Sequence, residues 1–381
     1  MIYREKEEID IEKIQKWGLL AVKIGQVHAL RLDFLPVEKC SKLSFLYRKN
    51  IEIAPDDALA KINKDIFENF EKKPVASASV GQVHRAKYKG EDVAVKIIKQ
   101  NFKESFINDV NSIKKLLKFS LFFFPKLKGV FDPLGVLEHI EEYTVKEIDL
   151  LKEIEGQDIL KKIYEENKKF DLSKLSFPKI YKEISTSDVM VSQFLEGKTF
   201  DQLIDEKKLP YEKLLELFRI HGFYLFKIGT FHGDIHPGNI ILEGDKIYFI
   251  DTGAISQASK RLSQGLLKFF DHLSVYEYEE SAKELNNMAE IKIDGNAYLK
   301  FKNNFLKLYK DFTNKTVSQV SLTQKMMETI KLGVNSGMHF EKGMFPIIKS
   351  LMYLDGMVLR CNPDAILLKD MRKYIDELKV D

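Results

Sequence analysis

The residues that could do chemistry gather between His232 and Gly253, in the stretch HGDIHPGNIILEGDKIYFIDTG. Asp234 and Asn239 stand five residues apart in a predicted loop, and Asp251 follows the second of two short predicted strands. We expect the strands to form a hairpin, so that two carboxylates and one amide can converge. Carboxylate and amide oxygens are ligands that Mg²⁺ prefers, which indicates chemistry at a phosphate group.

This spacing resembles the catalytic and metal-binding loops of kinases. Phosphoryl transfer needs little covalent help from a protein, because positioning and neutralisation of phosphate charge do most of the work. In such a site Asn239 and Asp251 would hold the metal ion, and Asp234 would orient the attacking group or take its proton. The structural alternative makes Asp234 and Asn239 turn residues beside Pro237 and Asp251 a cap. Each residue alone fits that alternative, whereas the whole set favours the chemistry.

A second motif lies at residues 74–99, where the apolar pattern changes from helical spacing to alternation. It predicts a hairpin with a turn at 89–92 and a second strand, Val93 to Ile98, that carries Lys96. In kinases a strand lysine in this Val-Ala-Val-Lys context pairs with nucleotide phosphates and with a glutamate of the next helix. An isolated match is weak, but Lys96 precedes the acidic set in the order that a kinase requires.

The segments that would contact a nucleotide differ from those of ordinary kinases. An alanine- and serine-containing loop stands in place of the glycine-rich one, and these residues resist the positive φ angles that glycine takes freely, so a stiffer cradle is expected. A strand at 189–194 leads to a hinge that would bind adenine through its backbone. The nucleotide-binding residues predicted here are Ala76, Ser77, Ala78, Ser79, Val80, Gln193 and Leu195.

The N-terminal stretch predicts one amphipathic helix over residues 9–32. Lys23 and Gln26 lie three residues apart on its edge, within Lys-Ile-Gly-Gln, and by spacing alone the lysine is a rim residue. Residues 37–70 are predicted to form further short helices, one of which begins near Pro55.

Taken together, the motifs resemble those of the UbiB-like atypical kinases, also called aarF-domain kinases. The resemblance spans roughly residues 15–365 and rests on Lys-x-Gly-Gln, the alanine-rich loop, the strand lysine and the HGDxHPGN loop. It implies that Glu153 partners Lys96, and that Glu147 or Asp149 of a Glu-x-Asp motif holds Lys23. The alternative is that these are ordinary solvated helix carboxylates. Gln193 stands where the family often has glutamate, which leaves the preferred base open.

The resemblance also implies an α+β, two-lobed protein-kinase-like fold with a helical N-terminal extension packed over the active site. We expect a helical extension at 1–70, an N-lobe with the alanine-rich loop and a helical insertion at 71–197, and a helical C-lobe at 198–381. The predicted helices of the C-lobe are 201–209, 211–230, 260–274 and 344–363. The Ala-Pro-Glu element that anchors protein substrates in kinases is not seen, which argues against a protein substrate.

Composition limits the class of protein. Sixty Lys and Arg against 57 Asp and Glu leave a net charge of +3, so no nucleic-acid partner is expected. Cys40 and Cys361 lie far apart, which predicts neither a disulfide framework nor a zinc site. The start MIYREKEEID lacks the apolar core of a signal peptide, and no stretch reaches membrane-spanning length. We expect a cytoplasmic protein, with peripheral contact at the inner face of a membrane as a further option.

The family likeness implies ATP or ADP with Mg²⁺, and an ATPase or kinase that supports isoprenoid quinone (ubiquinone) biosynthesis by acting on lipid intermediates or their enzymes. Lys23 and Gln26 would cover the place where a protein substrate docks. Two alternatives stay open: a hydroxyl kinase of the aminoglycoside or choline type, which shares HGDxHPGN, and a nucleotide-gated scaffold for lipid or partner without turnover. The candidate lipid-facing segments are the helix around Trp17 and the segment Leu116 to Leu127.

Overall fold

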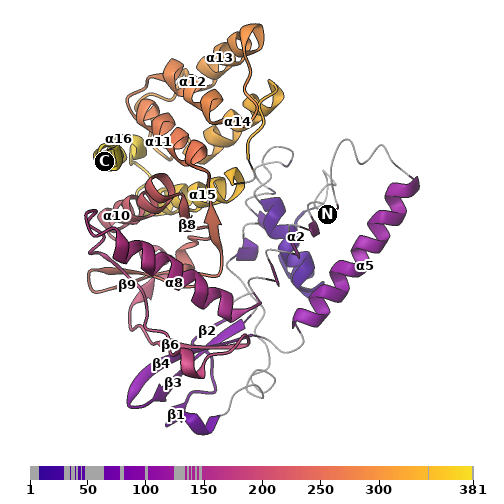
Figure 1. The fold of residues 1–381 in the computed structure, drawn as a ribbon, viewed down its shortest axis with the longest axis vertical. Helices are drawn as coiled ribbons and strands as arrows, with labels where there is room; N and C mark the ends of the chain where they lie inside the picture. The colour runs from indigo at the N-terminus through magenta and orange to yellow at the C-terminus, as the bar shows by residue number, and fades with distance from the viewer. Residues whose placement is uncertain are drawn as a thin grey trace. The chain divides into compact units, whose positions relative to one another are not determined.

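The computed structural model combines helices with small sheets, as expected for an α+β protein (Figure 1). It describes residues 8–29, 35, 39, 42–43, 45–47, 64–77, 81–98, 102–123, 134, 137–138, 140–141, 144–145, 148–341 and 343–379. The chain forms two compact units, residues 1–157 with 178–195, and residues 158–177 with 196–381. Our three-part division at residues 70 and 197 stays a prediction.

The first unit is built on an antiparallel sheet of order β1–β3–β4–β6, with β2 added to β3. Its strands are β1 (Asn69–Phe70), β2 (Ala76–Ser77), β3 (Gly81–Tyr88), β4 (Glu91–Ile98) and β6 (Val189–Gln193). The β3–β4 hairpin turns through Lys89 and Gly90, whose φ angles of 50° and 78° are those of a tight two-residue turn. The predicted hairpin is therefore confirmed, with a shorter turn than expected.

The register of this sheet decides which way Lys96 faces. Lys96 pairs with Val83 on one side and with Met190 on the other, so these three side chains share one face. Val93 and Val95 belong to the opposite face, where they are fully buried in a cluster of aromatic and aliphatic side chains. Strand alternation thus separates the lysine from that core.

Helices of the first unit gather on the face of the sheet that carries Lys96. They are α2 (Leu19–Ala29), α5 (Phe102–Phe123) and the start of α8 (Leu150–Glu166), whereas α1 (Ile11–Lys16) packs with α2 in a separate cluster. Leu19 and Leu20 of α2 pack into a cluster with Ile98, Ile154 and Met190. Each such leucine contributes about 2 kcal/mol on burial, which fixes α2 beside the strand and the helix that carry the site residues.

Two predictions for the N-terminal segment were wrong. The single helix expected over 9–32 is interrupted at Gly18, whose φ of 96° is a left-handed conformation that ends α1 and lets α2 begin in a new direction. Phe70 belongs to strand β1, paired with Ala86, and not to a helix. The predicted helix start at Pro55 lies outside the described residues.

The second unit holds two small sheets. The first has the order β5–β10–β9–β7, and the second pairs β11 with β8. The strands are β5 (Leu175–Ser176), β7 (Lys198–Thr199), β8 (Thr230–His232), β9 (Ile240–Glu243), β10 (Lys246–Phe249) and β11 (Ile255–Gln257). The β9–β10 hairpin is the one predicted from the sequence. The short β8–β11 pair was not predicted. Thr230, which was expected to end the helix at 211–230, is the first residue of β8.

Helices make up the rest of the second unit. They are α9 (Phe200–Asp205), α10 (Tyr211–Gly222), the π-helical turn η4 (Phe223–Ile228), the short turn η5 (Pro237–Asn239), α11 (Lys260–Ser274), α12 (Tyr278–Met288), α13 (Gly295–Tyr309), α14 (Leu322–Asn335), α15 (Met344–Cys361) and α16 (Leu367–Lys379). The predicted helix at 260–274 is confirmed residue for residue, and α15 confirms the packed apolar helix expected at 344–363. Phe269, Phe305 and Tyr309 form a fully buried aromatic row between helices.

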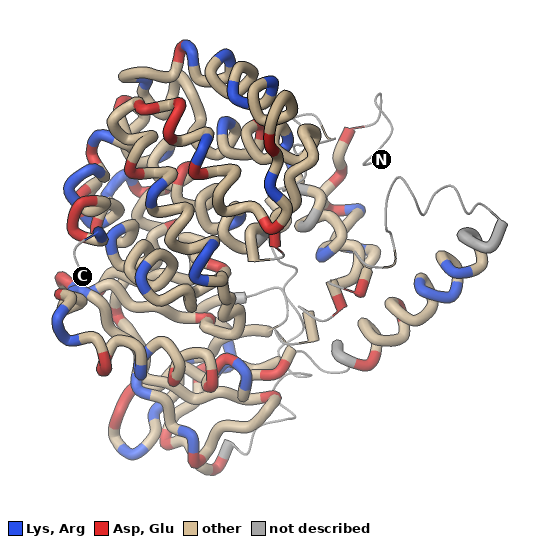
Figure 2. The backbone as a smooth tube through the Cα atoms, turned by 45° about the horizontal axis from the view of Figure 1, so that its top comes forward, with Lys and Arg blue, Asp and Glu red and all other residues tan. Residues whose placement is uncertain are grey.

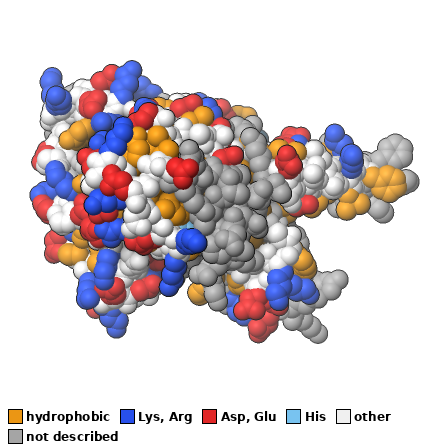
Figure 3. Space-filling model, turned by 90° about the horizontal axis from the view of Figure 1, so that it is seen from below, with side chains coloured by type: hydrophobic (Ala, Val, Ile, Leu, Met, Phe, Trp, Pro, Cys, Tyr) orange, Lys and Arg blue, Asp and Glu red, His pale blue; other side chains and the backbone are white. Residues whose placement is uncertain are grey.

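Charges of both signs lie side by side on the helices of the second unit (Figure 2). Figure 3 shows hydrophobic side chains interspersed with acidic and basic ones over the face in view. Exposed ion pairs such as Lys283–Glu280, 3.0 Å between charged atoms, add little to stability because water screens both charges. None of the helices in the described part of the chain is long and apolar enough to cross a bilayer.

His221, near the end of α10, is a histidine held neutral by its surroundings. It is 2% exposed, and neither ring nitrogen has a hydrogen-bond partner among the described residues. Its ring meets Phe231 edge to face at 5.7 Å between centroids. Burial, and secondarily the nearby His232, lowers the pKa of His221 to about 3.

We predict that acid destabilises the protein partly through His221. In the unfolded chain this histidine has a pKa of about 6.5, so between that pH and about 3 the unfolded state binds a proton that the folded state does not. The free energy of unfolding should therefore fall by about 2 kcal/mol between pH 7 and pH 5 on account of this group. Urea unfolding at both pH values, compared with the His221→Phe variant, measures the difference. An equal pH dependence in both proteins would contradict the assignment.

Candidate active site

A buried ion pair joins strand and helix in the first unit. The Nζ atom of Lys96 on β4 lies 2.6 Å from Oε2 of Glu153 on α8, and the two side chains are 10% and 8% exposed. Val83 and Met190 flank the lysine across the sheet. The structure thus brings together the strand lysine and the helix glutamate that the sequence singled out.

The start of α8 is tied to the sheet, and this places Glu153. The Oδ1 atom of Asp149 accepts a hydrogen bond from the Leu151 N–H at 3.0 Å, as in a helix N-terminal cap. The Leu150 N–H donates to the Ser187 carbonyl at 2.9 Å, just before β6. Glu153 lies in the first turn of α8, where the helix dipole favours a carboxylate. Asp149 therefore precedes α8 as its cap residue, whereas Glu153 lies within the helix.

The Lys-Ile-Gly-Gln motif lies in α2, and its side chains face inward. Lys23 is 5% exposed, so it is not the rim residue that spacing alone suggested. The Nε2 atom of Gln26 donates to the Leu46 carbonyl at 2.9 Å. A Cβ on Gly25 would collide with a methyl of Leu46, so a larger residue here requires that side chain to move away from α2 at the turn Phe45–Tyr47. Glu147, the other expected partner of Lys23, lies outside the described residues.

The predicted phosphate loop and hinge are described in part. Ala76 and Ser77 form β2, and Ala78, Ser79 and Val80 lie outside the described residues. A Cβ on Gly81, where β3 begins, would lie 2.5 Å from the Ile97 carbonyl. At the other end of the sheet, the Gln193 N–H donates to the Lys179 carbonyl at 2.8 Å, and the following Leu195 is buried.

In the second unit, His232 joins the loop of Asp234 to the strand that precedes Asp251. Nε2 of His232 lies 3.2 Å from the Ile250 carbonyl, and its Nδ1 accepts the Asp234 N–H at 3.2 Å. Complete burial lowers the pKa of His232, although the nearby acidic groups oppose this. A neutral ring with its proton on Nε2 satisfies both contacts.

Hydrogen bonds to backbone carbonyls hold the segments of Asp234 and Asp251 close together. The Asn239 Nδ2 donates to the Asp234 carbonyl at 3.0 Å, and the Ile250 N–H donates to the Asn239 carbonyl at 3.0 Å. The Gly233 N–H donates to the Ala254 carbonyl at 2.7 Å, beyond Asp251. Asp251 itself has a φ of 54°, a left-handed conformation that aspartate tolerates better than most residues. The structure thus brings Asp234, Asn239 and Asp251 close together, in loops that are joined by hydrogen bonds.

Sequence reasoning missed one residue of this group. The Nζ atom of Lys349, in the middle of α15, lies 3.0 Å from Oδ1 of Asp234. Burial opposes ionisation of Asp234, but the charge of Lys349, with smaller help from His236 and His232, lowers the pKa of the carboxyl below its ordinary value. The signal in the sequence is a lysine inside the mostly apolar helix predicted at 344–363.

The donor set in the second unit fits a magnesium ion. Because the amide nitrogen of Asn239 is used by the Asp234 carbonyl, its amide oxygen is the atom available to a cation, and Asp251 adds a carboxylate. Among the described residues, no three His, Cys, Asp or Glu side chains are grouped so as to hold a metal ion. Mg²⁺ needs no such grouping, since it usually takes one or two protein ligands together with phosphates and waters.

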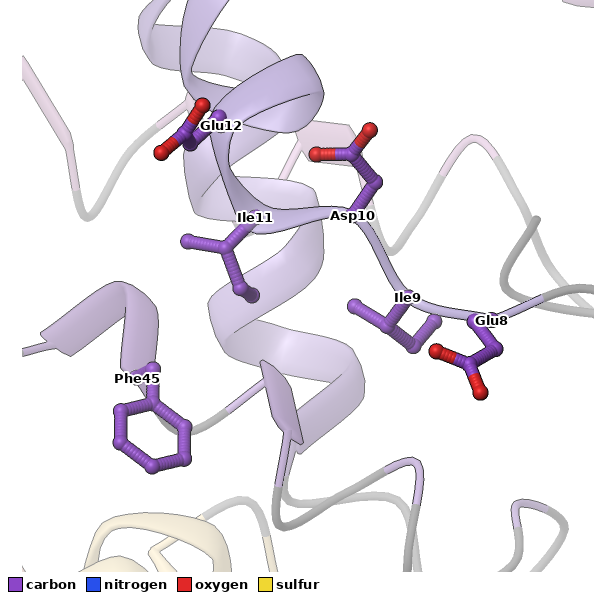
Figure 4. Close-up of a pocket in the computed structure, with 6 residues that line it drawn as sticks. All are labelled: Glu8, Ile9, Asp10, Ile11, Glu12 and Phe45. Carbon is purple, nitrogen blue, oxygen red and sulfur yellow. The ribbon is translucent and has the colours of Figure 1, made fainter.

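A cavity of about 710 Å³ opens at the start of α1 in the first unit, and none of the predicted site residues lines it (Figure 4). Glu8, Asp10, Glu12 and three apolar side chains line it. Asp10 caps α1 by accepting the Lys13 N–H at 3.0 Å, and Glu8 pairs with Lys42 at 3.1 Å. Asp10 and Glu8 therefore have local structural roles, and no acidic side chain at this cavity was predicted to be functional.

Comparison with known proteins agrees with this geometry. A sequence profile described as the ABC1 atypical kinase-like domain matches residues 41–285, more than half of the chain. The protein named ACTIVITY OF BC1 COMPLEX KINASE 8, chloroplastic, of Arabidopsis thaliana is 30% identical over 303 residues, which are 74% of this chain but only 38% of that protein. The probable protein kinase UbiB of Blochmanniella pennsylvanica is 26% identical over 387 residues, 95% of this chain and 69% of that protein.

A solved structure is also similar. The complex of Rv3197 with erythromycin from Mycobacterium tuberculosis matches with a TM-score of 0.59 over 96% of this chain and 94% of that one. At 19% sequence identity this likeness shows the fold alone. With the sequence profile, it confirms the expected kinase-like α+β fold.

We predict that Glu153→Gln destabilises the first unit by about 3 kcal/mol, because it leaves the buried ammonium of Lys96 without its counter-charge. Urea unfolding measures this loss. Glu155→Gln is the matched control, since Glu155 is exposed on the same helix and pairs with Lys152 at 2.7 Å, where a loss below about 1 kcal/mol is expected. Equal losses in the two variants would contradict a buried, mutually dependent pair.

Proposed function

Because the chain belongs to the ABC1 atypical kinase-like family, we propose that it binds ATP or ADP with Mg²⁺ and acts as a phosphotransferase or ATPase. The observation that carries this proposal is the buried Lys96–Glu153 pair at 2.6 Å. In kinases this pair must form before the lysine can contact nucleotide phosphates. A buried charge pair is also a poor source of stability, which makes a purely structural role the weaker explanation.

Each predicted site residue has a role in this proposal. Lys96 contacts the phosphates and Glu153 orients it, while Asn239 and Asp251 hold Mg²⁺, which neutralises phosphate charge when bound. Asp234 orients the attacking hydroxyl or water and accepts its proton. The segment Ala76 to Val80 covers the phosphates, and Gln193 and Leu195 offer backbone groups to adenine.

We propose that the phosphoryl group is transferred to water, to a small molecule or to a lipid, and not to a protein. The sequence has no Ala-Pro-Glu element to anchor a protein substrate. Lys23 and Gln26 belong to a helix that packs beside the Lys96 strand in the first unit, which supports their proposed role in excluding a protein chain. Glu147 or Asp149 is the proposed partner of Lys23.

We further propose a role in isoprenoid quinone biosynthesis, at lipid intermediates or the enzymes that use them. The support is the likeness to the protein named UbiB, together with the kinship to proteins named for the BC1 complex. Contact with the inner face of a membrane would be peripheral in this proposal, and the site of action cytoplasmic.

Asp251→Asn should abolish Mg²⁺-dependent nucleotide binding. We expect the affinity for ATP in Mg²⁺ to fall at least tenfold, to the level seen in EDTA, because the main carboxylate ligand of the ion is lost. Calorimetric titration measures this. Asp245→Asn is the matched control, since Asp245 lies at the exposed turn of the same hairpin, paired with Lys174 and Lys213. Mg²⁺-dependent binding that survives in the Asp251 variant would sink the assignment.

Asp234→Asn should separate catalysis from scaffolding. In cells that lack their own UbiB-type protein, the unaltered chain is expected to restore quinone levels, measured by mass spectrometry of lipid extracts. The Asp234 variant should fail, because it cannot accept the proton of the attacking group. Full function of that variant would favour the nucleotide-gated scaffold, and failure of the unaltered chain would contradict the pathway.

A further inference from the structure

Lys349 is a buried lysine inside an apolar helix, and its place there needs a reason. It is 7% exposed, in the middle of α15, and its neighbours Ile347 and Ser350 are fully buried. Removing an ammonium from water is costly unless the charge is paired. A hydrophobic residue would fill the same position without that cost.

The charge of Lys349 is directed at Asp234. Nζ of Lys349 lies 3.0 Å from Oδ1 of Asp234, and the two side chains are 8% and 19% exposed. Stability does not account for the pair, because well-packed apolar residues usually stabilise a protein as much as a buried ion pair or more. We therefore look for the role of the pair in the loop that carries Asp234. Lys349 belongs to α15, outside that loop, and its ammonium holds the Asp234 side chain.

A second side chain on the same face of α15 contacts the next part of the loop. Tyr353, one helical turn beyond Lys349, meets the ring of His236 edge to face, with centroids 5.3 Å apart and planes at 86°. The Nζ atom of Lys349 lies 5.8 Å from the centre of the Tyr353 ring. The Nδ1 atom of His236 accepts the Gly238 N–H at 3.1 Å, within the turn that leads to Asn239. Two residues of α15 thus contact both halves of the loop.

Resting on the proposed function, we propose that Lys349 is a positioning residue for phosphoryl transfer and that it acts through Asp234. Its ammonium holds the Asp234 carboxylate in the orientation that accepts a hydrogen bond from the attacking water or hydroxyl. In the reaction, the attacking oxygen bonds to the terminal phosphorus as the bond to the ADP oxygen breaks, and its proton passes to Asp234. Lys349 itself makes no bond to the substrate.

The first test separates kcat from binding. Lys349→Met should lower kcat for nucleotide hydrolysis at least tenfold and change the Kd of Mg-ATP less than threefold, because Lys96, Asn239 and Asp251 are intact. Lys349→Arg, which keeps the charge, should recover at least a third of the rate. The matched control is Lys325→Met, which removes a lysine of α14 paired with Glu328 at 3.4 Å and should leave kcat unchanged. An unchanged kcat in Lys349→Met overturns the proposal.

A double-mutant cycle distinguishes positioning from a general loss of structure. If Lys349 acts through Asp234, adding Lys349→Met to Asp234→Asn should lower kcat less than twofold further, because the group to be positioned is already altered. Losses that multiply in the double variant would show that Lys349 acts independently of Asp234, and would overturn the proposal.

A third readout does not depend on turnover. In the free protein, Lys349→Met should raise amide hydrogen exchange in residues 233–239 at least tenfold, with exchange in α11 unchanged, whereas Lys325→Met should change neither. If the unaltered chain has no turnover, the proposed function fails, and exchange alone decides the role of Lys349. Unchanged exchange in this loop overturns that role whatever the activity. If Lys349→Met does not fold, Lys349→Gln replaces it in every arm.

Discussion

The ion pair between Lys96 and Glu153 is the interaction on which the account of this protein depends. The pair joins a strand to a helix that begins more than fifty residues later, and both side chains are almost fully buried. A buried pair of opposite charges is tolerated only when both partners are held in good geometry. The strand and the helix that carry the two residues must therefore be held firmly in place.

In the first unit, strand pairing and hydrogen bonds connect the segments of both Lys96 and Glu153 to the sheet. Antiparallel pairing on both sides of β4 fixes Lys96, and the cap at Asp149 together with the bond from Leu150 to Ser187 fixes the start of α8. Helix α2 then packs its leucines against the same elements. In the second unit, a neutral buried histidine does comparable work, since His232 links the backbone of Asp234 to that of Ile250. Hydrogen bonds to the backbone thus hold the segments that carry both sets of proposed site residues.

Local pattern was enough to predict much of the fold. Apolar alternation predicted the β3–β4 hairpin with Lys96 and the β9–β10 hairpin before Asp251, because side-chain alternation and turn residues are local signals. The helix at 260–274 was predicted for the same reason. The break at Gly18 was missed because an isolated glycine in a helical pattern has two readings, and only the left-handed φ decides between them.

Features that depend on distant contacts could not be predicted in this way. Strands β1, β8 and β11 have two or three residues each, too few for a periodic signal, and they exist because a partner strand lies beside them. Among the site residues, Glu153 was predicted from the resemblance of its motif to that of the UbiB-like kinases. In the structure it is paired with Lys96. Nothing in the sequence near Asp234 points to Lys349, because that contact forms only when α15 packs against the loop.

The most direct test of the central claim is a calorimetric titration of ADP into the full chain in the presence of Mg²⁺, with Lys96→Met and Lys87→Met compared with the unaltered protein. Lys87 is an exposed lysine on the neighbouring strand, and its variant controls for the lost charge. The account predicts saturable binding by the unaltered chain and by the Lys87 variant, and at least tenfold weaker binding by the Lys96 variant. Equal binding by all three proteins, or none by the unaltered chain, would contradict it.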